Sequence, residues 1–278
     1  MDPMREDAFD RILAHIDRSR RSNGATTCAV GPFTLYWDYA RPTIGTTVVA
    51  TSDVHDLLRR ANEDPPWASI ARNKLLVEWD ELEWIAERHP ELAGVVSDAG
   101  LAVRTNPVLI KYADAITKTA SITPIGAQAE KVGANSDPRE LLAAWRFADA
   151  TGPAPLQSPE GVLDGIRRVA ASLSEDEVAT WRRHHADAGS GQVVVRSQGR
   201  IVALGMHEPS AEVSEITSLA VLPPFRRRGF GTALAAALAA DAFDRGKDLV
   251  YVESAPEAAE LYVRAGFQLI GSIGRASL

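Results

Sequence analysis

The spacing of apolar and polar positions predicts alternating helices and strands in the first half of the chain. Residues 6–20 put Phe9, Ile12, Leu13 and Ile16 on one face at helical spacing, which is typical of an amphipathic helix. Runs rich in β-branched and aromatic residues predict strands instead. The other elements predicted here are strands at 31–37, 46–50 and 73–78, helices at 53–60, 80–88 and 90–99, and an extended segment at 101–112.

The second half separates helices from strands more sharply. The pattern predicts helices at 138–150, 159–172, 175–186, 229–245 and 256–265, and strands at 192–196, 200–206, 212–221, 248–252 and 267–270. Meandering strands followed by helix, strand, helix and strand are typical of an α+β fold, a mixed sheet flanked by helices. Glycine, asparagine and proline gather between the halves, so the predicted domains are 1–117 and 118–278.

Length and composition indicate in which cellular compartment the protein acts and which classes of partner it can bind. No apolar run approaches the roughly 20 residues that span a bilayer, and the charged N-terminus lacks the apolar stretch of a signal peptide. Cys28 is the only cysteine and cannot form an internal disulfide. These features favour a cytoplasmic protein with no membrane partner. The net charge of −7 argues against a nucleic-acid partner, because proteins that bind nucleic acid usually present a basic surface.

The strongest chemical signal is a turn that follows a predicted strand and opens a long apolar helix. The first amides of such a helix have no partner within it, and the helix dipole adds about half a positive charge there. Gly229 and Gly231 leave room for a ligand to approach the backbone. Arg226, Arg227 and Arg228 add full positive charges. The turn is therefore predicted to bind a pyrophosphate.

Two familiar phosphate motifs do not fit this turn. The Walker A motif needs Gly-Lys-Ser/Thr, which is absent, and the Rossmann fingerprint needs a third glycine where the chain has Leu234. A plain strand–helix turn, with its glycines used only for packing, is the structural alternative. The adjacent arginines, the prolines before them and the long apolar helix favour phosphate binding over that alternative.

The order of residues around the turn resembles the GNAT (Gcn5-related N-acetyltransferase) superfamily. The family's pyrophosphate motif occurs as Arg-x-x-Gly-x-Gly at 226–231, with a typical lead-in of Leu-Ala-Val-x-Pro-x-Phe at 219–225. The resemblance covers about residues 120–278 and is sharpest at 212–270. It implies the GNAT fold, acetyl-CoA as the co-substrate and no metal.

The resemblance also implies which residues bind the co-substrate. The backbone of Leu219, Ala220 and Val221 would pair with the pantetheine arm, and the N–H of Leu219 would polarise the thioester carbonyl. The residues implied to hold the pyrophosphate are Arg226, Arg227, Arg228, Gly229, Phe230, Gly231 and Thr232.

A second landmark of the family is a helix that ends in Leu-Tyr-x-x-x-Gly-Phe, found here at 261–267. The resemblance gives Tyr262 the role of protonating the departing CoA thiolate, which suits a phenol with a pKa of about 10. A half-buried helix aromatic with its hydroxyl at the surface is the alternative. Ala255 departs from the family, because members often have asparagine seven residues before this tyrosine. Ser254 is the candidate substitute.

Acetyl transfer to an amine requires a base, or a chain of waters, to take the amine proton. Glu215 is the candidate base, because it lies on the strand that would bear the acetyl group. It is four residues before Leu219, and the period of two predicts that both side chains share one face of that strand. A solvated glutamate at a strand end is the alternative. His184 and His185 are predicted to lie at the surface, and no cluster has metal spacing. The other candidate bases are Glu212, His207 and Glu253.

The first half lacks a glycine-rich turn after a strand, so one CoA site is expected in the whole chain. Its strand–helix order at 46–60 is joined by Thr-Ser-Asp at 51–53, which puts a carboxylate where phosphate would bind. A helix that starts with Pro-Glu and ends in Ala-Gly occurs at 90–100 and again at 256–266. This echo favours a degenerate GNAT-like domain over an unrelated α+β domain. The candidates for lining an acceptor pocket, or alternatively for core packing, are Trp67, Trp79 and Trp84.

These features predict an N-acetyltransferase that moves an acetyl group from acetyl-CoA to an amine of a small molecule or peptide by direct attack. One alternative is a non-catalytic acyl-CoA-binding or regulatory protein on the same fold, which the change at Ala255 motivates. Another is acetylation of a cysteinyl pseudo-disaccharide in bacterial thiol synthesis, a reaction of some tandem GNAT chains. The predicted partners are an amine acceptor and, in a possible homodimer, a second copy of the chain.

Overall fold

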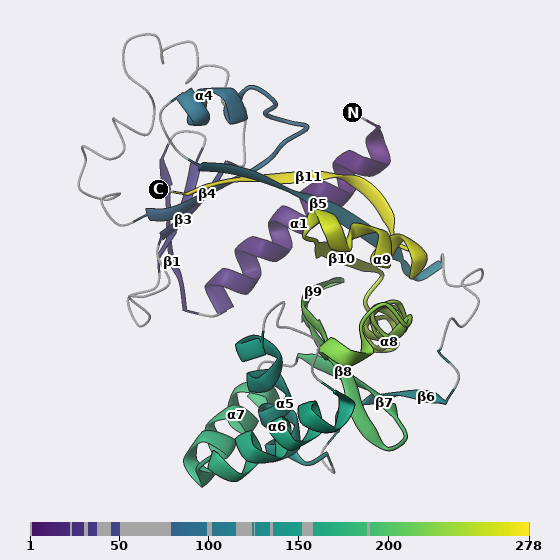
Figure 1. Cartoon of the computed structure of the whole chain (residues 1–278). Coiled ribbons are helices and arrows are strands. Elements are labelled where there is room, and N and C mark those ends of the chain that lie inside the picture. The colour runs from purple at the N-terminus through teal and green to yellow at the C-terminus, as the bar shows by residue number, and fades with distance from the viewer. Residues whose placement is uncertain are drawn as a thin grey trace. The chain divides into compact units, whose positions relative to one another are not determined.

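The structure is a computed structural model that describes residues 2–22, 24–30, 33–37, 46–50, 79–98, 102–114, 124, 126–133, 136–151, 158–187 and 190–277. The chain forms two compact units (Figure 1). Unit 1 contains Met1–Val108, Glu253–Pro256 and Leu269–Leu278, and unit 2 contains Leu109–Val252 and Glu257–Gln268. The last strand of the chain therefore belongs to unit 1. The predicted boundary between residues 117 and 118 lies outside the described residues and stays a prediction.

Unit 2 is built on a mixed sheet whose strands follow the order β6, β7, β8, β9 and β10. Their bounds are Ala127–Lys131, Gly191–Ser197, Arg200–Ser210, Val213–Val221 and Leu249–Glu253. Neighbours from β6 to β9 pair antiparallel, whereas β10 runs parallel to β9. A two-residue turn with positive φ at Gln198 and Gly199 joins β7 to β8, as the twist of a hairpin requires.

Helices cover both faces of the unit 2 sheet (Figure 1). Alternate residues of β7 face opposite sides, so Val193 and Val195 pack under one helix layer and Val194 packs under the other. The layer over Val194 consists of α5 (Pro138–Thr151), α6 (Pro159–Ser172) and α7 (Glu175–Asp187). The opposite layer consists of the apolar helix α8 (Phe230–Asp244) and the short helix α9 (Ala259–Arg264). The helices predicted at 138–150, 159–172, 175–186 and 229–245 are therefore confirmed.

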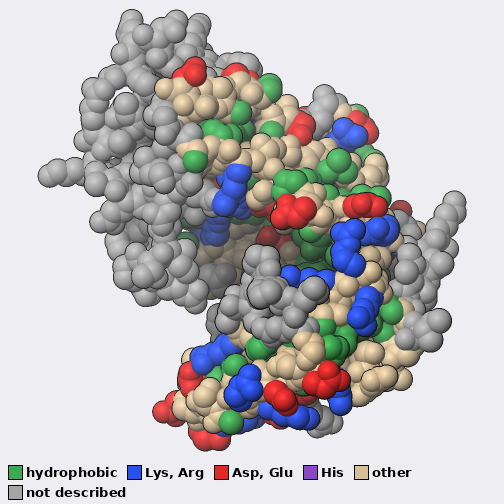
Figure 2. All heavy atoms as spheres, in the orientation of Figure 1, with side chains coloured by type: hydrophobic (Ala, Val, Ile, Leu, Met, Phe, Trp, Pro, Cys, Tyr) green, Lys and Arg blue, Asp and Glu red, His purple; other side chains and the backbone are tan. Residues whose placement is uncertain are grey.

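The outer surface of the α5–α7 layer carries mixed charge. Figure 2 shows acidic and basic side chains interspersed over this face. Some of them form ion pairs, such as Arg139 with Glu175 at 2.5 Å and Arg146 with Glu177 at 2.8 Å. Exposed pairs of this kind contribute little stability, so the layer is held mainly by its apolar contacts with the sheet.

Unit 1 holds most of a second run of strands, in the order β1, β2, β3, β4, β11 and β5, whereas Leu109–Tyr112 of β5 and Gln268 of β11 belong to unit 2. Their bounds are Thr26–Val30, Phe33–Trp37, Thr46–Ala50, Trp79–Ile85, Gln268–Ser277 and Ala102–Tyr112. The described helices of this unit are α1 (Pro3–Ser22) and α4 (Leu92–Asp98). β11 pairs antiparallel with β4, from Ile273 opposite Ile85 to Ser277 opposite Glu81. The C-terminal strand is thus an internal strand of the unit 1 sheet.

A buried ion network fixes β11 in unit 1. Glu83 of β4 is 4% exposed and accepts hydrogen bonds from Arg20 of α1, at 2.5 Å, and forms an ion pair with Arg275 of β11. The Arg275 guanidinium also donates two hydrogen bonds of 2.5 Å to Glu253, which accepts a third from Asn106 at 2.6 Å. Removing one partner of such a pair is costly, because it leaves a buried charge uncompensated.

The prediction of a helix at 80–88 is wrong, because β4 occupies most of this segment. Glu and Leu favour helix locally, but Leu82 and Trp84 alternate with acidic residues at the spacing of a strand. Pairing with β3 on one side and β11 on the other decides the outcome. β1 and β6 are additional strands that the pattern missed. The helix predicted at 53–60 and the strand predicted at 73–78 lie outside the described residues.

Candidate active site

The turn before α8 has the geometry of an anion-binding helix start. The 3-10 turn Pro223–Phe225 follows β9, and the chain then enters α8 through Gly229, the N-cap residue. Gly229 has a left-handed φ of 85°, which glycine adopts without strain. The first hydrogen bond of the helix runs from the N–H of Ala233 to the carbonyl of Gly229, at 3.0 Å. The amides that precede this ladder belong to Phe230, Gly231 and Thr232.

Glycine is required at the two positions of the motif for different structural reasons. A Cβ on Gly231 would lie 2.5 Å from Cδ1 of Leu261, so this glycine lets α8 and α9 pack closely. A Cβ on Gly229 would meet Pro124 at an ordinary 3.5 Å, so only its positive φ requires glycine there. Packing of α9 on α8 is thus a reason for Gly231 that the sequence interpretation did not include, and the approach of a ligand to both glycines stays a prediction.

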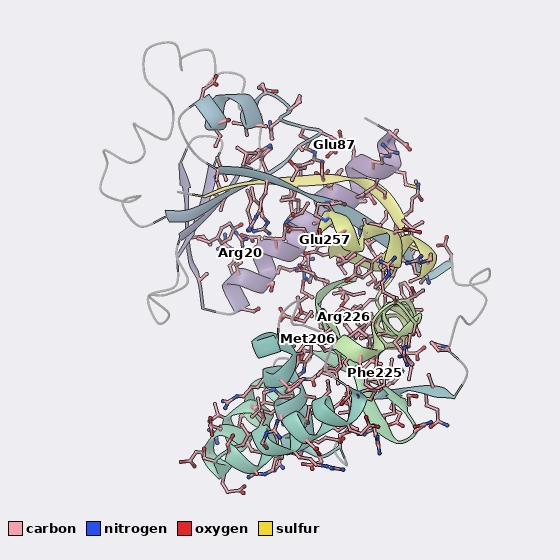
Figure 3. The ribbon with its side chains drawn as sticks, in the orientation of Figure 1. Arg20, Glu87, Met206, Phe225, Arg226 and Glu257 are labelled. Atoms are coloured by element: carbon pink, nitrogen blue, oxygen red, sulfur yellow. The ribbon has the colours of Figure 1, made fainter. Side chains whose placement is uncertain are left out.

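The three arginines of the turn are exposed beside the start of α8. Figure 3 shows Arg226 and Phe225 near α8. Arg226 donates a hydrogen bond from Nε to the carbonyl of Val221, at 3.0 Å. The Arg228 guanidinium lies 5.9 Å from the centre of the Phe225 ring, within the range of a cation–π contact. Arg227 takes a left-handed φ of 62°. Three positive charges therefore lie next to the amides of the helix start.

β9 and β10 pair over only part of their length in the described sheet. Their registered pairs run from Leu249 opposite Val213 to Tyr251 opposite Glu215. From Ile216 to Val221, β9 continues to pair with β8 but not with β10. We call the side of β9 that faces away from β8, at 216–221, the open edge. An open edge of this kind presents backbone donors and acceptors to a ligand.

The hydrogen-bond pattern decides which backbone groups face the open edge. The N–H of Leu222 donates to the carbonyl of Val202 on β8, at 3.0 Å. In an antiparallel pair, every second residue directs its backbone groups toward the partner strand. The N–H and C=O of Ala220 therefore point to β8, whereas those of Leu219 and Val221 point to the open edge.

A β-bulge lies in β9 where the open edge begins. Met206 is opposite Ser218, but the next residue of β8, His207, is opposite Ile216, so Thr217 is an extra residue. The bulge resets the alternation of side chains. Leu219 packs on the α8 side with Ile216, whereas Glu215 projects from the other face. The expectation that Glu215 and Leu219 share a face is therefore wrong, because it assumed an unbroken period of two.

Glu215 has a partner that the sequence did not reveal. The hydroxyl of Tyr251 donates to Oε2 of Glu215 at 2.7 Å, across the last registered pair of β9 and β10. Tyr251 is 1% exposed, whereas Glu215 is partly exposed. The only sequence signal was a tyrosine within the apolar run Leu-Val-Tyr-Val at 249–252.

Tyr262 lies on α9, on the α8 side of the sheet. Its side chain is 6% exposed and packs edge-to-face on Phe267, with ring centres 5.7 Å apart. Burial raises the pKa of Tyr262 to about 12, so the phenol stays protonated at neutral pH. The ammonium of Lys111 donates to the carbonyl of Ala265 at 2.7 Å and thereby caps the end of α9. Glu215 and Tyr262 consequently lie on opposite faces of the same sheet.

The other candidate bases have different surroundings. Glu212 is exposed in the turn between β8 and β9, at the end of β9 remote from the arginines. Glu253 belongs to unit 1, where Arg275 and Asn106 hold its carboxylate. The side chains of His184 and His185 lie outside the described residues.

His207 is buried beneath α8, where both of its ring nitrogens have partners. Its Nδ1 lies 2.7 Å from the hydroxyl of Ser214, and its Nε2 lies 3.0 Å from Oδ2 of Asp241. Asp241 also accepts from Lys131 at 3.0 Å and from Arg245 at 2.8 Å. An ionised carboxylate only accepts, so Nε2 carries the proton and Nδ1 accepts from Ser214. With both nitrogens engaged and no exposed surface, His207 is a core histidine.

This network predicts a pH dependence of stability. Burial lowers the pKa of His207 below its ordinary 6.5, against the opposing effect of Asp241 and with a smaller contribution from Arg245 and Lys247. Just below pH 6.5 the unfolded chain thus binds a proton that the folded chain does not. The free energy of unfolding is therefore complete above pH 6.5 and falls below it, by up to about 1.4 kcal/mol per pH unit.

Urea unfolding at several pH values between about 8 and 5 measures this dependence. The matched variant His207→Gln keeps a polar side chain but loses the titrating group. It is expected to be less stable at the upper pH and to show a flatter dependence below pH 6.5. Equal slopes for the two proteins would contradict the assignment to His207. Asp241, whose pKa is lowered below 3.8, contributes only at more acidic pH.

The remaining candidates for cofactor contact or for the acceptor pocket lie in unit 1, or their side chains are not described. The Ser254 hydroxyl donates to the carbonyl of Ala255 at 2.8 Å, and Ala255 is exposed. Trp84 is 2% exposed and packs against the backbone of Gly274, so its role is core packing. Trp67 and the side chain of Trp79 are not described.

The described residues offer neither a cluster of metal ligands nor a helix suited to a membrane. Within these ranges, no group of three or more His, Cys, Asp or Glu side chains is placed to hold a metal ion. The helices that the structure describes include none with the length and apolar character to cross a bilayer.

Solved structures share the fold along most of the chain. A GCN5-related N-acetyltransferase from Kribbella flavida matches with a TM-score of 0.65 and 19% identity, over 96% of this chain and 94% of that chain. One from Sphaerobacter thermophilus matches with a TM-score of 0.54 and 18% identity, over 88% of this chain and 76% of that chain. A tandem GNAT protein from the clavulanic acid biosynthesis pathway has a TM-score of 0.50 and 12% identity, over 88% and 78%. At these identities the likeness shows the GNAT fold.

The family is recognised in the second half of the sequence. No protein of curated function matches the chain significantly. The family model described as "Acetyltransferase (GNAT) family" matches residues 163–267. This segment contains α8 with its arginine turn, the open edge of β9, and α9 with Tyr262. Residues 163–267 therefore match the GNAT acetyltransferase family model, within a chain that has the GNAT fold.

Proposed function

We propose that the chain transfers an acetyl group from acetyl-CoA to an amine of a small molecule or peptide. The observation that carries the proposal is the ending of β9–β10 pairing at Glu215 and Tyr251, beside a helix start with three arginines. A thioester lying along the open edge would place its diphosphate at the start of α8 and its acetyl group near the bulge. The acceptor amine would then approach from the face that carries Glu215.

In this proposal the donor is bound by backbone groups and by charge. The N–H and C=O of Leu219 and the N–H of Val221 would pair with the amides of the pantetheine arm, in the manner of an added strand. The pyrophosphate would lie against the amides of Phe230 to Thr232, where the helix dipole favours negative charge. The exposed arginines at 226–228 would supply the neutralising charge.

The reaction that these positions favour is direct attack. The amine nitrogen forms a bond to the acetyl carbon, the carbon–sulfur bond breaks, and the electron pair of that bond leaves with the sulfur. Glu215 would take the amine proton through water, and Tyr262 would give a proton to the thiolate. Because Glu215 and Tyr262 lie on opposite faces of the sheet, base and acid are on opposite sides of the reacting carbonyl. The Leu219 N–H is the proposed donor to the developing oxyanion.

The surroundings of Glu215 support an amine as the acceptor. Glu208 of β8 is directly opposite Glu215 in the antiparallel register, so two carboxylates project side by side from this face. A cationic amine would be attracted to such a pair. We propose that the reaction takes place in the cytoplasm. Assembly into a homodimer stays a prediction.

A thiol-release assay with a panel of primary amines tests the proposal, with mass spectrometry of the acetylated product as the confirming measurement. The expected result is product formation with at least one amine and its loss in Glu215→Gln. Calorimetry with CoA on the same protein provides the comparison. Tight CoA binding without turnover on any amine would contradict the transferase and favour the acyl-CoA-binding alternative. A product from a cysteinyl pseudo-disaccharide alone would favour the bacterial thiol reaction.

A further inference from the structure

The hydrogen bond between Tyr251 and Glu215 lies where β9 and β10 part. Both residues belong to the last registered pair of the two strands, and their side chains share the face opposite α8. The Tyr251 ring is 1% exposed, so the sheet and its neighbours hold it in one position. Its hydroxyl is thus a fixed donor, 2.7 Å from Oε2 of a partly exposed carboxylate.

A fixed donor has two physical consequences for a glutamate side chain. Glutamate loses rotamer freedom when it is ordered, and a buried partner offsets part of that loss before any substrate arrives. A hydrogen bond donated to a carboxylate also favours its charged form over its protonated form. Tyr251 therefore orients Glu215 and favours its ionised form.

Another neighbour acts in the opposite direction. Glu208 lies across from Glu215 on β8, and a nearby like charge favours the protonated form of a carboxylate. Glu208 and Tyr251 are the titratable groups of β8 and β10 in register with Glu215. Glu208 and Tyr251 thus act in opposite directions on the proton affinity of Glu215.

We infer that Tyr251 is a positioning residue for the proposed acetyl transfer, holding the Glu215 carboxylate ionised and aimed at the ammonium group of a cationic acceptor amine. The inference rests on the proposed function for its role in turnover, but the pairing itself is testable without turnover. Tyr251 does not reach the thioester in this scheme. It acts through Glu215, whereas Tyr262 acts from the other face of the sheet.

The test is the pH dependence of kcat/KM in the wild-type protein and in Tyr251→Phe. Both proteins are measured with the same acceptor amine, so that ionisation of the amine affects the two profiles equally. Phenylalanine keeps the ring and removes the donor. Loss of a charge-assisted hydrogen bond is expected to move the acidic limb upward by about one pH unit, which is about a tenfold loss of rate at acidic pH. The rate at alkaline pH and the KM for acetyl-CoA are expected to change less than about threefold.

Glu208→Gln is expected to shift the acidic limb in the direction opposite to Tyr251→Phe. Removing the like charge favours ionised Glu215 and is expected to move the acidic limb downward. A carbon-13 NMR titration of the glutamate carboxyls gives a second readout, with the Glu215 signal identified by its loss in Glu215→Gln. Its midpoint is expected to rise in Tyr251→Phe and to fall in Glu208→Gln. Because the titration needs no substrate, it applies even to a protein that acetylates no amine.

The outcomes separate the inference from the proposed function. An unchanged acidic limb, or an unchanged carboxyl midpoint in folded Tyr251→Phe, overturns the role of Tyr251. A wild-type protein inactive toward every amine overturns the proposed function, while a midpoint that still rises in Tyr251→Phe keeps the pairing. Far-ultraviolet circular dichroism and melting confirm that each variant is folded before either measurement.

Discussion

Replacing Gly229 by aspartate is expected to weaken CoA binding by about 100-fold or more. Gly229 is the N-cap of α8 and has a φ of 85°, a conformation that Asp and Asn tolerate better than other residues with side chains. A Cβ at this position meets only Pro124, at an ordinary 3.5 Å, so a small side chain has space. The added carboxylate would lie beside the proposed pyrophosphate, where the amides and arginines now present positive charge.

Electrostatics gives the size of this effect. Two like charges about 5 Å apart repel by about 3 kcal/mol at an effective dielectric of about 20. That energy is more than a factor of 100 in the dissociation constant. The matched control is Gly229→Asn, which has nearly the same shape and the same backbone strain without the charge. It is expected to lose no more than about tenfold.

Calorimetric titration with CoA measures both variants, and thermal melting of the free proteins shows whether each is folded. Dissociation constants that stay at the wild-type value in both variants would place the pyrophosphate elsewhere. Equal losses in both, with unchanged melting, would assign the loss to bulk at the helix start and not to charge.

The arginine turn was predictable because its determinants are local. The strand end, the prolines, the three arginines and the glycines are contiguous in sequence, and a helix start exposes its amides wherever it occurs. The reason for Gly231 was not predictable in the same way. It depends on the contact with Leu261, which is thirty positions later in the chain and is brought close only by the packing of α9 on α8.

The pairing of Glu215 with Tyr251 is long-range in the same sense. The sequence placed Glu215 on the correct strand, but the bulge at Thr217 depends on how β8 and β9 align. Nothing between Glu215 and Leu219 marks an extra residue. Tyr251 becomes a neighbour only through the parallel register of β10 with β9, and that register depends on how α8, which connects the two strands, packs on the face of the sheet.

Unit 1 shows the same limit at the scale of whole strands. The segment at 79–85 has residues that favour helix, and its strand structure depends on β11, from the far end of the chain. The network of Glu83 with Arg20 and Arg275 joins three segments that no local pattern relates. Sequence reasoning therefore captured the elements with strong local signals and missed those that long-range pairing creates.

Replacing Tyr262 by phenylalanine is expected to lower kcat by about 100-fold while the affinity for acetyl-CoA stays nearly unchanged. Tyr262 lies on the α8 side of the sheet and is the proposed general acid. Loss of a general acid typically lowers the rate by 10²-fold to 10⁴-fold. The Tyr262 ring would keep its contact with Phe267, because the substitution conserves the packed volume. Stability is therefore expected to fall by only about 1 kcal/mol.

The measurement is the single-turnover rate of acetyl transfer, because slow product release would hide a change in the chemical step. Tyr112→Phe, a half-buried tyrosine of β5, is the matched control for removing a phenol hydroxyl from unit 2. It is expected to keep the wild-type rate. An undiminished rate in Tyr262→Phe would return this side chain to the alternative of a packed helix aromatic.

The pH profile adds an independent check on the same residue. Burial raises the pKa of Tyr262 to about 12, so the phenol keeps its proton across the whole range in which the amine acceptor becomes neutral. Loss of the acid form is therefore not expected to reduce the wild-type single-turnover rate below about pH 11. A decline of the rate near pH 10 that disappears in Tyr262→Phe would mean that the phenol titrates as an exposed tyrosine does. That result would contradict the assignment of Tyr262 as a buried general acid.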